Sequence, residues 1–192
     1  MFKESIDNDE ILKLPIGTFD GEIVIIDNKD DMLSAAQYLS SFDVIGYDTE
    51  TRPSFKKGVS NKVSLLQLSG PNRCYLIRLN QTRLSAELIN VLENKEIIKV
   101  GAAIRDDIRL MCQRQRFSPG GFVDLQSMVG EFGIKELSVK KMAAIILGVR
   151  VSKAQRLTNW EAKSLTESQL IYAATDAWIC REMYLKLTAN KI

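Results

Sequence analysis

The chain has 192 residues, of which 45% are hydrophobic and 26% charged, as in an ordinary globular domain. Its formal net charge is only +2, and it has no histidine, which excludes mechanisms and zinc sites that need an imidazole. The three cysteines are odd in number and far apart, so they argue against a disulfide framework or a cysteine zinc site and favour a reducing compartment.

The N-terminal residues are expected to form an arm, and the rest of the chain a single domain. Pro15 and Gly17 interrupt any regular element in residues 1–20, which leaves residues 21–192 for the domain. The first residues are polar and acidic, unlike a signal peptide, and no stretch approaches the roughly 18 apolar residues of a membrane span. We therefore expect a cytoplasmic protein without membrane contacts.

Short β-rich runs and helical repeats succeed one another along the chain. The expected strands are 22–27, 44–47, 63–68, 74–79, 97–102 and 122–125. The expected helical segments are about 28–41, 85–92, 104–112, 127–132, 138–147 and 166–187. The last of these begins with Thr166 and Gln169 at the spacing of a capping box.

The order of the elements predicts the fold class. A turn at Gly70-Pro71-Asn72 joins two expected strands into an antiparallel meander. The later strands alternate with helices, which is typical of parallel pairing. The sequence therefore predicts an α/β fold of three layers with a mixed central sheet flanked by helices.

Two acidic residues end the expected strand 44–47. Asp48 and Glu50 are separated by one residue, so their side chains point to the same side of an extended chain. Two anions held that close repel one another unless a cation lies between them. The alternative is a pair of solvated acids at an exposed strand end.

A second acidic pair, Asp106 and Asp107, begins the expected helix 104–112. Strand ends are where sites form in sheets of this kind, and we select Asp107 as the site residue. The alternative for both residues is stabilisation of the helix dipole, and Asp106 is expected to face solvent.

Tyr172 and Asp176 lie four residues apart on the last expected helix, so they share a face. Apolar neighbours surround them, and a partly buried Asp is costly without a cation or hydrogen bonds. The alternative is a hydrogen-bonded Asp–Tyr pair with a packing role. With no histidine available, a purely carboxylate site selects Mg²⁺ or Mn²⁺, and two such ions support phosphodiester cleavage.

Charge is distributed unevenly along the chain. Residues 1–50 hold 12 of the 24 acidic side chains but only three of the 26 basic ones. The remainder is therefore strongly basic, which suggests a polyanionic partner such as nucleic acid, and an ordinary solvated basic face is an equally open alternative.

The acidic and tyrosine residues together resemble a known family. Asp48-Thr49-Glu50, Asp107 and Tyr172-x-x-x-Asp176 are similar, in order, to the three motifs of the DEDD superfamily in its tyrosine branch. Further runs that carry the likeness are 46–55, 63–68, 100–107, 158–161 and 165–177. The likeness covers roughly residues 22–187, and within this branch, which also includes ribonuclease D, the sequence most resembles the Werner-syndrome exonuclease subgroup.

The resemblance implies a ribonuclease H-like fold and a metal-dependent 3′→5′ exonuclease that releases 5′-mononucleotides. It implies that Asp48 bridges two metal ions and that Glu50 and Asp176 complete the site of the water-activating ion. It also implies that Asp107 holds the second ion, partly through water, and that Tyr172 orients the attacking water.

Several other side chains are candidates for contacts with a nucleic acid that has a free 3′ end. The basic candidates are Arg52, Lys56, Lys57, Lys153 and Arg156. Trp160 is a candidate for stacking on a base, although packing in the core is the favoured alternative. The rival functions are a catalytically silent adaptor of the same fold and another phosphodiesterase of that fold. The short chain also raises the expectation of a homo-oligomer or a partner chain.

Overall fold

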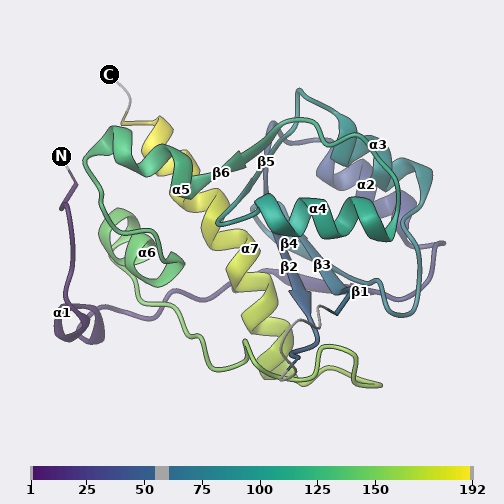
Figure 1. The fold of residues 1–192 in the computed structure, drawn as a ribbon, viewed down its shortest axis with the longest axis horizontal. Coiled ribbons are helices and arrows are strands. Elements are labelled where there is room, and N and C mark those ends of the chain that lie inside the picture. Colours follow the sequence, from purple (N-terminus) through teal and green to yellow (C-terminus); the bar gives the residue numbers. More distant parts are fainter. Residues whose placement is uncertain (1, 55–60, 191–192) are drawn as a thin grey trace.

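The computed structural model describes residues 2–54 and 61–190, which form a six-stranded sheet between two layers of helices (Figure 1). The strands are β1 (Glu22–Ile26), β2 (Val44–Thr51), β3 (Val63–Ser69), β4 (Arg73–Arg78), β5 (Ile98–Gly101) and β6 (Phe122–Asp124). The helices are α1 (Asn8–Leu12), α2 (Met32–Leu39), α3 (Ala86–Glu93), α4 (Arg105–Arg114), α5 (Leu125–Met128), η1 (Val129–Phe132), α6 (Val139–Leu147) and α7 (Glu167–Thr188).

The sheet is mixed, with strand order β1-β4-β3-β2-β5-β6. Strands β2, β3 and β4 form the predicted antiparallel meander, in which Asp48 pairs with Gln67. Strands β5 and β6 continue the sheet in parallel from β2. At the other edge β1 pairs in parallel with β4, an arrangement that the local sequence pattern did not specify. The predicted mixed sheet is confirmed.

Alternate side chains of the central strands bury against different helices, as the two-residue period of a strand requires. Leu66 and Leu68 of β3 lie in the core formed with α2, α3 and α4. Leu65 faces the opposite layer, where it packs with Trp160 and Tyr172. Both faces of β3 are thus buried, and α4 and α7 lie on opposite sides of the sheet.

Helix α7 begins where the capping-box signal placed its start. The Thr166 side chain accepts a hydrogen bond from the backbone N–H of Gln169, and the Gln169 side chain accepts one from the backbone N–H of Thr166. These bonds satisfy two of the N–H groups that a helix start leaves without partners. The helix then crosses the face of the sheet (Figure 1).

The N-terminal residues are more ordered than expected. Residues 8–12 form α1, so the prediction that the first 20 residues contain no regular element is wrong. Ile11 is fully buried and packs with Ala144 of α6, which gives this segment an apolar surface on which to fold. Gly17 donates its backbone N–H to the carbonyl of Arg150, which attaches the segment to the loop after α6.

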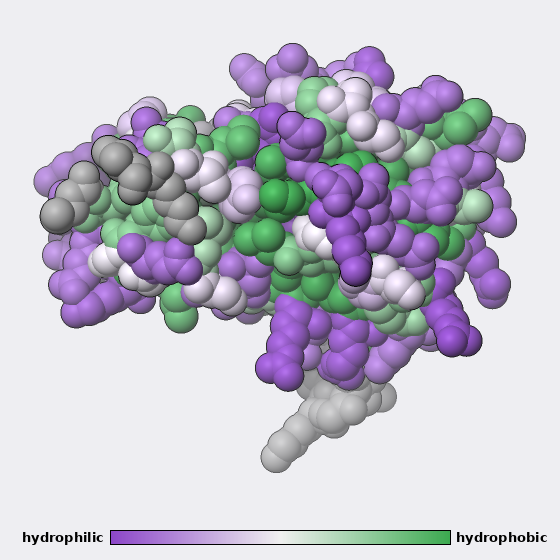
Figure 2. All heavy atoms as spheres, turned by 90° about the horizontal axis from the view of Figure 1, so that it is seen from above, coloured by the Kyte–Doolittle hydropathy of each residue, from purple (hydrophilic) through white to green (hydrophobic). Residues whose placement is uncertain are grey.

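Polar and apolar side chains are distributed unevenly over one face of the molecule. Figure 2 shows one face on which hydrophilic side chains form the rim and hydrophobic residues gather toward the centre. Over residues 2–54 and 61–190, no helix combines the length and apolarity that crossing a membrane requires.

Candidate active site

Strand β2 directs Asp48 and Glu50 toward α7. Gly46, two residues before Asp48, is in close contact with the backbone of Ala177 on α7, and residues two apart on a strand share a side. Asp48 is half-buried and Glu50 is buried. The two carboxylates therefore lie on the same side of β2, as expected, and face α7.

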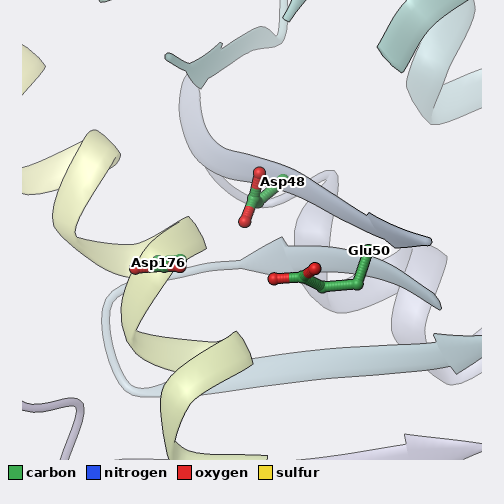
Figure 3. Close-up of side chains that lie close together, drawn as sticks. All are labelled: Asp48, Glu50 and Asp176. Atoms are coloured by element: carbon green, nitrogen blue, oxygen red, sulfur yellow. The ribbon is translucent and has the colours of Figure 1, made fainter. Parts of the chain in front are cut away.

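Helix α7 supplies the third carboxylate. Asp176 stands opposite β2, and its side chain approaches those of Asp48 and Glu50 (Figure 3). One oxygen from each of the three carboxylates lies within 4.8 Å of the other two. Tyr172, one helical turn before Asp176, is buried beside it and packs against Trp160 with 6.0 Å between the ring centroids. Residues far apart in the sequence thus meet at one point.

Asp107 comes from the opposite layer, in the first turn of α4. It lies outside the tight cluster of three carboxylates but lines the same cavity, which has a volume of about 530 Å³. Its neighbour Asp106 is exposed and pairs with Arg109 at 3.4 Å. The structure therefore places Asp107 in the cavity and Asp106 in solvent, as expected.

The turn that positions α4 depends on a carboxylate that the sequence reasoning missed. Asp124, at the end of β6, accepts hydrogen bonds from the backbone N–H groups of Ala103 (3.0 Å), Ile104 (3.1 Å) and Gln126 (2.9 Å). Ala103 has φ +60°, a left-handed conformation that is unfavourable for a residue with a side chain. Asp124 offsets that cost and fixes the start of the helix that carries Asp107. The sequence feature that could have identified Asp124 is an acidic residue at the end of a short expected strand.

Basic side chains complete the cavity. Lys153 and Arg156, on the loop before α7, line it together with Tyr172 and Asp176. Burial raises the pKa of Asp48, Glu50 and Asp176, and the positive charge of Lys153 on Asp48 and Asp176, or of Arg156 on Glu50, offsets a small part of that rise. The cavity is thus lined by both carboxylates and cations.

Burial shifts the protonation of every acid in the cavity. It is the largest cause of the raised pKa of Asp48 and Glu50, and the neighbouring carboxylates reinforce it. Burial also raises the pKa of Asp107 and of Asp176 to about 6. A hydrogen bond from the Tyr172 hydroxyl acts in the opposite direction on Asp176. Burial raises the pKa of Tyr172 as well, so its phenol stays protonated. A cluster of this kind needs either protons or a cation.

Without metal ions, the free energy of unfolding is expected to fall as the pH rises from about 4 through about 6. Asp107 and Asp176 have raised pKa values in the folded protein, so the folded state keeps protons that the unfolded chain has already lost. A shift of about two pKa units corresponds to about 3 kcal/mol for each carboxyl, and solvent screening of these partly exposed groups reduces this, so the decrease should be on the order of a few kcal/mol. Urea unfolding in EDTA at mildly acidic and neutral pH measures it.

The matched variant for this measurement is Asp176→Asn, which removes one of the shifted carboxyls. It should weaken the dependence of stability on pH relative to the unsubstituted protein. The same dependence in both proteins would show that Asp176 does not titrate with a raised pKa.

The other residues predicted to contact nucleic acid differ in their surroundings. Arg52 lies at the end of β2 and pairs with Glu161 at 3.6 Å. Lys56 and Lys57 lie outside the described residues. Trp160 is fully buried against Tyr172, so its predicted stacking on a base is wrong in this structure. The Trp160 indole packs in the core against Tyr172, which was the favoured alternative for this residue.

The donor set of the cluster fits a hard divalent cation. Asp48, Glu50 and Asp176 offer only oxygen, which Mg²⁺ and Mn²⁺ prefer. Oxygens bound to one Mg²⁺ lie at most about 4.2 Å apart. The observed separations of up to 4.8 Å therefore need only a small closure. Asp107, in the same cavity, is the fourth available carboxylate.

The sequence of this chain is similar to those of known proteins. The sequence pattern of a family described as 3′-5′ exonuclease matches residues 23–191. The bifunctional 3′-5′ exonuclease/ATP-dependent helicase WRN of Mus musculus is 31% identical over 184 residues, which cover 91% of this chain. They cover only 13% of the mouse protein, and the chain spans no more than 26% of the length of the first three curated relatives.

Solved structures share the fold. The EXO domain of Nibbler from Aedes aegypti superposes with a TM-score of 0.79 at 23% identity and covers 92% of this chain and 94% of its own. The exonuclease domain of EXD2, in a crystal soaked in Mn, has a TM-score of 0.52 at 29% identity. That match covers 87% of this chain and 89% of the EXD2 chain.

Proposed function

The chain belongs to the 3′-5′ exonuclease family, and from this premise we propose that it is a metal-dependent 3′→5′ exonuclease. It would hydrolyse phosphodiester bonds at the 3′ end of a nucleic acid and release 5′-mononucleotides. The observation that carries the proposal is the convergence of Asp48, Glu50 and Asp176 within 4.8 Å of one another. Asp107 and Tyr172 line the same cavity.

The four carboxylates would hold two Mg²⁺ or Mn²⁺ ions. When bound, such ions lower the pKa of water and stabilise charge on the leaving oxygen. The manganese soak of the related EXD2 domain supports a site of this chemistry. The raised pKa values of the acids support it too, because ligand carboxylates must lose their protons and a cation compensates the resulting repulsion.

The protein's own side chains would orient the substrate and the water. The Tyr172 phenol, protonated and fixed between Trp160 and Asp176, is the proposed donor and acceptor that aligns the attacking water. Lys153 and Arg156 stand at the cavity wall, where they would neutralise the phosphate. The excess of basic residues after position 50 supports a polyanionic substrate.

Metal removal tests the proposal. The purified protein is expected to shorten a 5′-labelled oligonucleotide stepwise from its 3′ end in Mg²⁺ or Mn²⁺, and EDTA should reduce the rate at least about 10³-fold. Chromatography of the products should show 5′-mononucleotides. Restoration of the rate by added Mn²⁺ is the control for irreversible damage. Tight binding of the oligonucleotide without any turnover in either metal would favour the adaptor function instead.

A further inference from the structure

A second large cavity lies away from the carboxylate cluster. Its volume is about 560 Å³, close to that of the cavity that holds the cluster. We call it the basic groove, because four cations, several amides and no carboxylate line it among the residues that the structure describes. The lining residues used below are Lys29, Lys62, Asn80, Arg83, Gln113 and Arg114.

The cations of the basic groove lack salt bridges in the part of the chain that the structure describes. Lys29, Lys62 and Arg83 are exposed, and none of the four cations forms an ion pair with a carboxylate within residues 2–54 and 61–190. Arg114 is held in place by a hydrogen bond to the backbone carbonyl of Leu79. Burial is the largest cause of the lowered pKa of Arg114, the charge of Glu161 opposes it, and repulsion between the guanidinium groups of Arg83 and Arg114 adds to it. An anion between them would relieve that repulsion.

The basic groove is connected to the carboxylate cavity by α4. Asp107 lines one and Arg114 the other, and seven residues separate them, so they lie on nearly the same face about 10 Å apart. Helix α4 begins beside α7 and extends away from it (Figure 1).

Strands β2 and β3 give a second connection of similar length. Glu50 is paired with Leu65 on β3, and Lys62 lies three residues before Leu65. At about 3.3 Å per residue this separation is again about 10 Å. Both routes therefore place the basic groove only a few nucleotides from the carboxylates, because one strand of a duplex rises about 3.4 Å per nucleotide.

We propose that the basic groove binds backbone phosphates of the strand being degraded, a few nucleotides on the 5′ side of the cleaved bond. This assignment rests on the proposed exonuclease function. The amides of Asn80 and Gln113 add neutral donors for phosphate oxygens. Contacts of this kind fix the register of a strand without reading its bases, so they suit both DNA and RNA. None of its described lining residues is acidic, so the groove positions the strand and takes no part in the chemistry.

Substrate length tests the groove. In Lys62→Glu/Arg83→Glu, kcat/KM for a single strand of about 20 nucleotides should fall about tenfold or more. For a trinucleotide, which is too short to reach the groove, kcat/KM should change less than about twofold. The salt dependence of binding to the long strand, measured by fluorescence anisotropy in Ca²⁺, should lose a slope of about 1.4, or about 0.7 for each phosphate contact.

The matched control is Lys95→Glu/Lys186→Glu, which changes the net charge equally. Lys95 is exposed in the connection between α3 and β5, and Lys186 lies near the end of α7, about 21 Å along the helix from Tyr172. This variant should keep its activity on the long strand within about twofold.

Four outcomes would overturn the assignment of the groove: equal losses on long and short substrates, equal losses in groove and control variants, a loss confined to duplex substrates, or no loss on the long strand. Absence of cleavage by the unsubstituted protein would contradict the proposed function itself.

Discussion

Asp48→Asn is expected to abolish metal-dependent shortening of an oligonucleotide, with a loss of at least about 10³-fold in kcat. Asp48 occupies the centre of the site, since its carboxylate meets Glu50 from the same strand and Asp176 from α7. Asparagine keeps the shape of the side chain but removes the charge that a divalent cation requires. The reaction is followed with a 5′-labelled strand, in Mg²⁺ and in Mn²⁺.

The same substitution should stabilise the metal-free protein. Burial and the charges of Asp176 and Asp107 already disfavour the ionised form of Asp48, as its raised pKa shows. Removing the charge removes that repulsion, so the free energy of unfolding in EDTA at neutral pH should rise on the order of 1–2 kcal/mol. A gain in stability with a loss of activity is the pattern expected of a residue kept for function.

A metal titration followed by thermal unfolding measures how Asp48→Asn changes both metal binding and stability. Mn²⁺ should raise the Tm of the unsubstituted protein, because only the folded state holds the cluster, and it should raise that of the variant much less. Asp106→Asn is the control, since Asp106 is an exposed acid in the same helical turn as Asp107. It should change stability by less than about 0.5 kcal/mol. Full activity of Asp48→Asn would contradict the proposed mechanism.

The parts of the site that the sequence predicted are those set by local periodicity. The two-residue period of β2 puts Asp48 and Glu50 on one side, and the helical period puts Tyr172 and Asp176 on one face of α7. The capping box fixed the start of that helix at Thr166. Nothing local brings β2 and α7 together, so the meeting of the three carboxylates followed only from the family resemblance until the structure showed it.

The parts that escaped prediction depend on tertiary packing. Lys99 is a charged residue on an apolar strand, yet it is fully buried because its ammonium group donates to the carbonyls of Val91, Asn94 and Ile97. The three hydrogen bonds of Asp124 likewise appear only when β6 lies beside the turn before α4. Cations far apart in the sequence, such as Lys29 and Arg114, form one groove only in the folded chain.

Gly46→Ala should damage both folding and catalysis, although Gly46 carries no chemical group. A Cβ atom at this position would overlap the carbonyl of Ala177, lying 2.6 Å from its carbon and closer still to its oxygen. The atoms that it would meet are all backbone atoms of α7, so no side chain can rotate away. The free energy of unfolding should fall by about 3 kcal/mol or more, at the upper end for overpacked sites. Urea unfolding in EDTA measures the loss.

Any Gly46→Ala protein that folds must hold α7 farther from β2, which separates Asp176 from Asp48 and Glu50. A shift of about 1 Å should lower kcat about 10²-fold and weaken Mn²⁺ binding, since the same helix carries Tyr172. Gly130→Ala is the matched control, because a Cβ at that exposed position meets no atom within 4 Å. It should keep its stability within about 0.5 kcal/mol and its activity unchanged. If Gly46→Ala matched Gly130→Ala in stability and in Mn²⁺ affinity, the close approach of α7 to β2 would not be what assembles the site.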